Sequence, residues 1–276
     1  SFTGPTSYNK IGIEAFSGCA SLSQFTNFPN LEVGEAALKD CSSLSYFDFG
    51  SNITGIGDEA FENCTSFTGD LTLPISIIDV GVGAFKNCGI DGELDISGCI
   101  SLTTIKQASF RDCNFTNELV LPDSVTSIKD SAFKNDGFTG SLILKSGINE
   151  IRKSSFEACR NIKKVYVDFD TNVFTSSNAF LDVGSDVGGA CIYTNQRDYY
   201  NYVSAAGGDW LFQGLPICRG GAFDSRVYRE SDDFILKSIS TDIPNGWYTT
   251  TITNVYLDIG SSATSIASNA FIGNFS

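Results

Sequence analysis

The sequence contains neither histidine nor methionine among its 276 residues. Because imidazole is the usual general base and a common metal ligand near neutral pH, the lack of histidine excludes Ser/His/Asp and Cys/His catalytic sites. No run of about 18 apolar residues occurs, so we expect no membrane span in this chain. Basic residues are also few, 18 against 32 acidic ones, and the resulting net charge of −14 argues against a nucleic-acid partner.

The sequence does contain a short motif that recurs every 22 to 25 residues. Repetition at periods of about 20 to 50 residues indicates a repeat architecture. The motif is alanine or serine followed by phenylalanine, at Ala15-Phe16, Ala60-Phe61, Ala84-Phe85, Ser109-Phe110, Ala132-Phe133, Ser155-Phe156 and Ala179-Phe180, with Ala37-Leu38 in the one gap. We call the second residue of each pair the anchor. Eight consecutive units result, and one further unit follows at Ala270-Phe271.

Two other positions keep the same phase. An aliphatic residue stands five positions before the anchor, at Ile11, Val33, Ile56, Val80, Ile105, Ile128, Ile151 and Ile266, and a cysteine three positions after it, at Cys19, Cys41, Cys64, Cys88, Cys113 and Cys159. Upstream, apolar residues alternate, as in Leu71/Leu73 and Leu94/Ile96, which predicts a short half-buried strand. Each unit should therefore hold a strand, a turn, an inward aliphatic residue and a tight helical or 3₁₀ turn.

One strand and one turn cannot enclose a core, but units stacked in register bury a continuous apolar face. The sequence therefore predicts a repeat solenoid of about eight coils, with parallel strands about 4.8 Å apart in one long sheet. The phenylalanine and cysteine columns should lie in its interior.

The motif resembles the BspA-like leucine-rich repeat. Leu119, Leu121, Pro122, Ile128, Ala132 and Phe133 fit its pattern, as do Leu71, Leu73, Pro74, Val80, Ala84, Phe85 and Cys88. The resemblance covers residues 8–181 and 255–273, and Leu38 and Asp136 depart from it by replacing the aromatic residue and the cysteine. It implies a right-handed solenoid in a microbial protein that is secreted or displayed on the cell surface. It also implies adhesion, with host extracellular-matrix proteins among the ligands.

The repeat motif disappears after residue 181 and reappears near residue 255, so the chain divides into four segments. We expect a leucine-rich repeat array over residues 1–181 and an aromatic capping segment over 182–220, where Tyr199, Tyr200, Tyr202 and Trp210 gather. A β-rich connector should span 221–254, with a hairpin between strands around Arg226–Tyr228 and Trp247–Thr253. A truncated further repeat should begin at 255 and run to 276.

The cysteine column is best interpreted as core packing. The chain has no C-x-x-C pair, and a ladder of thiols does not converge on a metal as tetrahedral zinc requires. We therefore expect no metal and no cofactor. Cys191 and Cys218, which flank the capping segment, are the pair best placed for a disulfide.

The outward residues of the strands form the candidate ligand-binding surface, because packing does not dictate their identity. They are Tyr46, Asp48, Asp70, Thr72, Glu118, Val120, Ile143, Lys164 and Tyr166. Aromatic and aliphatic residues among charged ones suit recognition of a protein or glycan. The alternative for Val120 and Ile143 is that they only satisfy β-propensity.

The sequence favours a non-catalytic binding module whose sheet face recognises a protein or glycan. One alternative is a passive spacer that projects another domain. A glycoside hydrolase with two carboxylates is compatible with the absence of histidine, but the repeat predicts no concave pocket to raise a catalytic pKa.

Overall fold

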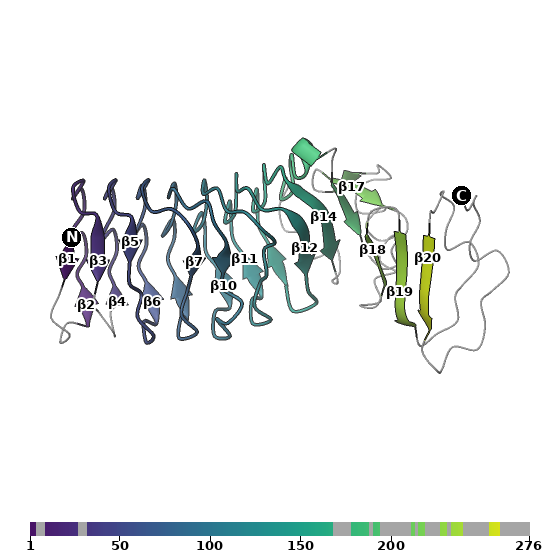
Figure 1. Ribbon diagram of the computed structural model, residues 1–276, viewed down its shortest axis with the longest axis horizontal. Coiled ribbons are helices and arrows are strands. Elements are labelled where there is room, and N and C mark those ends of the chain that lie inside the picture. The colour runs from purple at the N-terminus through teal and green to yellow at the C-terminus, as the bar shows by residue number, and fades with distance from the viewer. Residues whose placement is uncertain are drawn as a thin grey trace.

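The computed structural model describes residues 1–3, 9–26, 32–167, 178–187 and 190–193, and five further strands between 211 and 259. Its array consists of windings stacked side by side along the long axis of the molecule (Figure 1). The eight anchors enclose about seven turns of a parallel β-solenoid, which confirms the predicted fold.

The first strands of the windings line one side of the array. They fall into three separately hydrogen-bonded sheets and not the one long sheet expected, and we call them together the first sheet. These strands are β1 (Phe2–Thr3), β3 (Gln24–Thr26), β5 (Tyr46–Phe47), β7 (Leu71–Thr72), β9 (Leu94–Asp95), β12 (Gly140–Leu144) and β14 (Ile162–Val167). Their pairing is parallel wherever it occurs, and Asp95 forms a bridge to Val120 between β9 and β12. The alternating residues predicted to face inward, such as Leu71 and Leu73, are buried.

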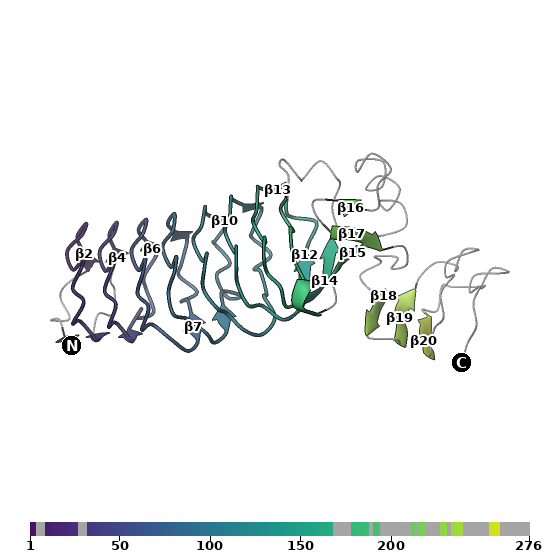
Figure 2. The ribbon, with the colours of Figure 1, turned by 90° about the horizontal axis from the view of Figure 1, so that it is seen from above.

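A second row of parallel strands was not expected. It comprises β2 (Lys10–Ile11), β4 (Glu32–Val33), β6 (Gly55–Ile56), β8 (Asp79–Val80), β10 (Thr104–Ile105), β11 (Ser127–Ile128) and β13 (Glu150–Ile151). Figure 2 shows β2, β4 and β6 side by side. Each strand ends on the aliphatic residue five positions before the anchor, so this column of aliphatic residues lies in a second row of hydrogen-bonded strands. Two residues per winding suffice because the neighbouring backbone is already at pairing distance.

The anchor lies in a series of tight turns and not in a helix, which corrects the expected helical or 3₁₀ turn. Backbone N–H groups there donate alternately to the next winding and within the turn: Phe61 N to Ala84 O at 2.7 Å, then Glu62 N to Glu59 O at 3.0 Å. The residues two before and two after every anchor have φ between 48° and 72°. Left-handed conformations cost free energy for residues with a Cβ, and here the bonds between windings offset that cost.

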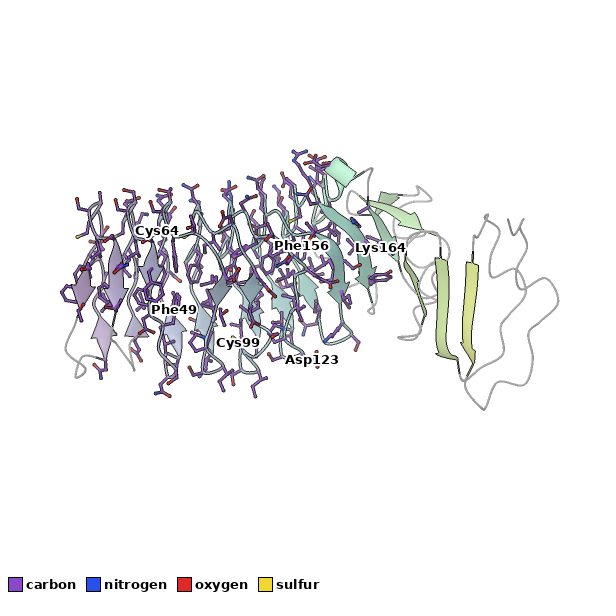
Figure 3. All side chains as sticks on the ribbon, viewed as in Figure 1. Phe49, Cys64, Cys99, Asp123, Phe156 and Lys164 are labelled. Atoms are coloured by element: carbon purple, nitrogen blue, oxygen red, sulfur yellow. The ribbon has the colours of Figure 1, made fainter. Side chains whose placement is uncertain are left out.

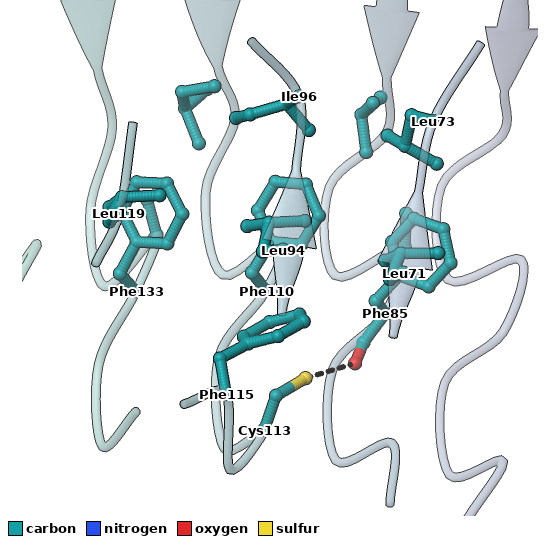
Figure 4. Packing of buried hydrophobic residues seen from close by; sticks show 14 of the residues in the cluster. Leu71, Leu73, Phe85, Leu94, Ile96, Phe110, Cys113, Phe115, Leu119 and Phe133 are labelled. Atoms are coloured by element: carbon teal, nitrogen blue, oxygen red, sulfur yellow. Dashed lines mark hydrogen bonds between the residues drawn. The ribbon is translucent and has the colours of Figure 1, made fainter. Parts of the chain in front are cut away.

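The anchors form a continuous spine inside the array. Five successive ring pairs from Phe61 to Phe180 stack with centroids 5.1 to 5.6 Å apart. Figure 4 shows Phe85, Phe110 and Phe133 on consecutive windings. Leu38 fills the anchor position in its own winding and is fully buried. The interior is lined with side chains along the whole array, including the labelled Phe49 and Phe156 (Figure 3).

The cysteine column also lies in the interior, except that Cys19, in the first winding, is exposed. Each buried thiol of the column donates to the carbonyl oxygen of the preceding anchor, as Cys113 does to Phe85 at 3.1 Å and Cys64 to Leu38 at 3.2 Å. Burial raises the pKa of Cys41 to about 11 and of Cys64 to about 12, so both are neutral thiols at physiological pH. All seven cysteines whose side chains the structure describes are free.

Asp136 occupies the column position where a cysteine is missing. It is 2% exposed, and neither of its carboxyl oxygens has a hydrogen-bond partner among the described residues. Burial raises its pKa well above the ordinary value of an aspartate. The winding keeps the regular geometry around it, because Phe133 still stacks on Phe110.

Beyond the array, β15 (Cys191–Tyr193) and β17 (Leu215–Cys218) extend the sheet of β14 in parallel, and β16 (Leu211–Phe212) pairs antiparallel to β17. A 3₁₀ helix spans Ser185–Val187. The aromatic residues Tyr199, Tyr200, Tyr202 and Trp210 of the predicted cap lie outside the described residues. So do the side chains of Cys191 and Cys218, which stay the pair best placed if a disulfide forms.

Within residues 221–254, β18 (Val227–Glu230) and β19 (Asp233–Ile239) form a hairpin. Its second strand comes earlier in the chain than expected, and the expected second strand around 247–253 lies outside the described residues. The strand β20 (Asn254–Ile259) then pairs parallel to β19, as successive windings of the array do. In the part of the chain that the structure describes, no helix is long and apolar enough to cross a bilayer.

Candidate functional site

The outward residues of the first sheet form two parallel rows. Strand register aligns Thr72 with Asp95 and Ile143 with Tyr166 in one row, and Ser141 with Lys164 in the other. One row therefore contains Asp48, Thr72, Asp95, Val120, Ile143 and Tyr166, and the other Tyr46, Asp70, Glu93, Glu118, Ser141 and Lys164. The nine residues singled out in the sequence thus share one face.

The exposure of these residues differs. Tyr46 and Val120 are each 51% exposed and Ile143 is 45% exposed, whereas Tyr166 is only 7% exposed. Asp70, Thr72 and Glu118 are exposed, and Asp48 and Lys164 are half-buried. Tyr166 therefore offers little surface to a ligand, which the alternation of the sequence did not reveal.

An open groove interrupts this face between β5 and β7. The two strands are not paired, since β5 ends one sheet and β7 begins another. The groove encloses about 510 Å³ and is lined chiefly by Tyr46, Asp48, Phe49, Asp70, Thr72 and Ile75. We call it the Tyr46 groove. It brings together four of the residues predicted from sequence.

The two carboxylates of the Tyr46 groove are held in place by backbone groups. Gly50 N donates to Asp48 Oδ1 at 2.9 Å, and Glu93 N donates to Asp70 Oδ1 at 2.8 Å. The second oxygen of each carboxylate has no hydrogen-bond partner among the described residues. Fixed carboxylates with a free oxygen are suited to accept hydrogen bonds from a ligand.

Two apolar contributors to the groove were not singled out from the sequence. Ile75 is 74% exposed, directly after the Pro74 turn, and the ring of Phe49 contributes to the wall although it is mostly buried. The available signal was the interval of 24 residues from Phe47 to Leu71, longer than the 22 from Phe25 to Phe47. The length of this interval does not show which residues of the winding bulge outward, so it could not identify Ile75 or Phe49.

The face changes character along the array. Acidic residues dominate from Asp48 to Glu118, while Val120 and Ile143 make the next part apolar and Lys164 adds a positive charge. The carboxyl with a strongly raised pKa, Asp136, lies in the core and not among the residues that line the groove. No cluster of three metal-ligating side chains occurs within the described windings.

Comparison with known families agrees with this architecture. A family model for the BspA type leucine rich repeat region matches six copies over residues 1–98 and 93–184. These matches span well over half of the sequence, so the chain belongs to the BspA-type leucine-rich repeat family. The family is one of repeat modules with binding or structural roles.

Two solved crystal structures resemble the chain. A leucine-rich repeat protein from Bacteroides ovatus is 18% identical, with 98% of this chain and 83% of that one covered and a TM-score of 0.40. The leucine-rich repeat protein of T. pallidum is 19% identical, with 78% and 85% covered and a TM-score of 0.41. No curated protein sequence matches the chain.

Proposed function

We propose that this chain is a non-catalytic binding module of a secreted or surface-displayed protein, and that it recognises a protein or glycan through the outer face of its first sheet. Adhesion to host extracellular-matrix proteins is the expected role. The observation that carries the proposal is the exposure of Tyr46, Val120 and Ile143 on one face of a rigid array. Exposed aromatic and aliphatic residues inside a polar rim are typical of recognition surfaces.

The site also argues against the hydrolase alternative. A glycoside hydrolase needs one carboxylic acid whose pKa is raised so that it can protonate the leaving group. Among the described acids, the one with a strongly raised pKa, Asp136, is sealed in the core, where a substrate has no access.

Binding to individual purified matrix proteins and to immobilised glycans tests the proposal. The variant Tyr46→Ala/Val120→Ala/Ile143→Ala removes the exposed apolar side chains of the face. A matched control, Ile13→Ala/Val82→Ala, removes two apolar side chains that are 66% and 37% exposed in the anchor turns, three residues before Phe16 and Phe85. We expect the face variant alone to lose binding.

The same experiment separates the module from a passive spacer. A spacer predicts that the unmodified chain captures none of these ligands, or that the face variant and the control behave alike. Either result would refute the proposal.

A further inference from the structure

Ion pairing distinguishes the acids of the sheet face from several acids of the turn edge. On the turn edge, which is the edge formed by the anchor turns, several acids are paired with lysines: Lys39 lies 2.7 Å from Glu62, and Lys134 lies 2.7 Å from Glu157. On the sheet face, no ion pair with a described residue forms at Asp48, Asp70, Glu93, Asp95 or Glu118. The acidic part of this face therefore has a negative potential that the described residues do not neutralise.

The Tyr46 groove is a place on this face where a ligand group can enter. No lysine or arginine is among the residues that line its volume of about 510 Å³. Asp48 and Asp70 contribute one carboxylate each from two successive windings, and Tyr46 contributes an exposed ring. Thr72 adds an exposed hydroxyl, and Ile75 adds an apolar rim.

Each of these groups favours a cationic side chain. Carboxylates accept short, strong hydrogen bonds from guanidinium and ammonium groups, and arginine can engage a carboxylate with two N–H groups at once. An exposed aromatic ring attracts the same cations through its π-face. An apolar rim accommodates the aliphatic stem that carries the charge.

We propose that the Tyr46 groove binds an arginine or lysine side chain of a polypeptide ligand, held between the carboxylates of Asp48 and Asp70 and the ring of Tyr46. This inference rests on the proposed function and specifies its ligand as a protein with a basic segment. Glu93, Asp95 and Glu118 on the following windings provide further acids for basic residues that flank the inserted one.

Fluorescence anisotropy with a labelled peptide of alternating glycine and arginine tests the inference. The matched peptide replaces arginine by citrulline, which has nearly the same shape and no charge. Titrations at about 50 and 150 mM salt measure how much of the binding free energy is electrostatic, because added salt screens the attraction between exposed charges. We expect the citrulline peptide to bind about tenfold or more weakly.

Variants of the full chain locate the site. Asp48→Asn and Asp70→Asn retain an oxygen that can accept the backbone N–H bonds, so the fold should persist, and thermal unfolding checks it. Each should weaken binding of the arginine peptide about fivefold to tenfold, and Tyr46→Leu about threefold or more. Glu35→Gln, at an exposed acid on the turn edge, should change it less than about twofold.

Equal binding of the two peptides, or equal binding by the groove variants and Glu35→Gln, would overturn the inference, since the attraction would then be non-specific. Capture of a neutral oligosaccharide with no binding of the arginine peptide would also overturn it. In both cases the proposed function survives if the Tyr46→Ala/Val120→Ala/Ile143→Ala variant still loses its matrix or glycan ligand.

Discussion

The thiol of Cys113 donates a 3.1 Å hydrogen bond to the carbonyl oxygen of Phe85 on the preceding winding (Figure 4). The same relationship recurs at Cys41, Cys64, Cys88 and Cys159. The column thus does more than fill space, because each of these thiols bonds an anchor carbonyl of the preceding winding. At Phe85 this bond adds to the one that the same carbonyl oxygen accepts from Cys88 N. Where Asp136 interrupts it, the chain has a buried carboxyl in place of a thiol.

Asp136→Cys should stabilise the array. Because the pKa of Asp136 is raised on folding, the folded chain binds more protons than the unfolded chain once the pH exceeds about 4, so stability falls as the pH rises from there. Replacement by cysteine removes this penalty and should raise the free energy of unfolding at pH 7 by about 1 to 3 kcal/mol.

Chemical denaturation between pH 4 and pH 8 measures this gain, which should shrink toward the acidic end. Asp130→Asn, at an exposed acid close by, is the control and should leave the pH profile unchanged. A gain that is the same at every pH would contradict the assignment of a buried, protonated carboxyl.

Phe110→Ala should cost about 3 to 5 kcal/mol of stability, because it leaves a cavity between Phe85 and Phe133. Phe110→Leu should cost markedly less, since Leu38 fills the equivalent position without exposure. Urea denaturation gives both values. The surface change Val120→Ala should stay within about 0.5 kcal/mol, and equal losses for Ala and Leu at position 110 would contradict a tightly packed spine.

The phenylalanine and cysteine columns of the core could be predicted from the sequence, because apolar side chains at the same position of every repeat stack on one another inside the array. Phe61, Phe85 and Cys88 are all buried as expected. The second strand ladder was missed because two residues such as Asp79–Val80 show no alternation. The candidate site could be predicted only as one face of the array. Neither the burial of Tyr166 nor the groove beside Tyr46 follows from the alternation of apolar residues, because both depend on the packing between neighbouring windings.

The left-handed turn positions did leave a signal in the sequence. Two residues after the anchor stands glycine, asparagine or aspartate in seven of eight windings, and these types tolerate positive φ best. Asn87 also donates to Asn63 on the preceding winding at 2.8 Å. Ala158, with φ of 61°, is the exception.

Ala158→Asn should therefore stabilise the chain by about 0.5 to 1 kcal/mol, by reducing the cost of the left-handed backbone and by adding a side-chain bond to Asn135. Differential scanning calorimetry should show a higher Tm. Ala20→Asn, at an exposed site whose φ is not positive, should leave Tm nearly unchanged. A lower Tm for Ala158→Asn would show that side-chain packing at this turn dominates over backbone strain.

Glu150 should stabilise the array except at low pH. Hydrogen bonds from Lys129 and Ser127 lower its pKa to about 2, so its contribution is complete above the unfolded value near 4.3 and is lost as the pH falls through 2. Glu150→Gln should cost about 1 to 3 kcal/mol at pH 7 and almost nothing at pH 2.

Urea titrations at the two pH values measure this cost. Asp123→Asn breaks a comparable pair with Lys145, but the Asp123 side chain is 82% exposed, so its loss should stay below about 1 kcal/mol. Equal costs for the two variants at pH 7 would contradict a special role of Glu150.

Hydrogen exchange with and without a captured ligand tests most directly whether the outer face of the first sheet is the binding surface. We expect slower exchange on binding in segments that contain Tyr46, Asp70 and Ile143, and no change in the anchor turns around Phe61 and Phe133. Protection confined to the anchor turns would contradict the account.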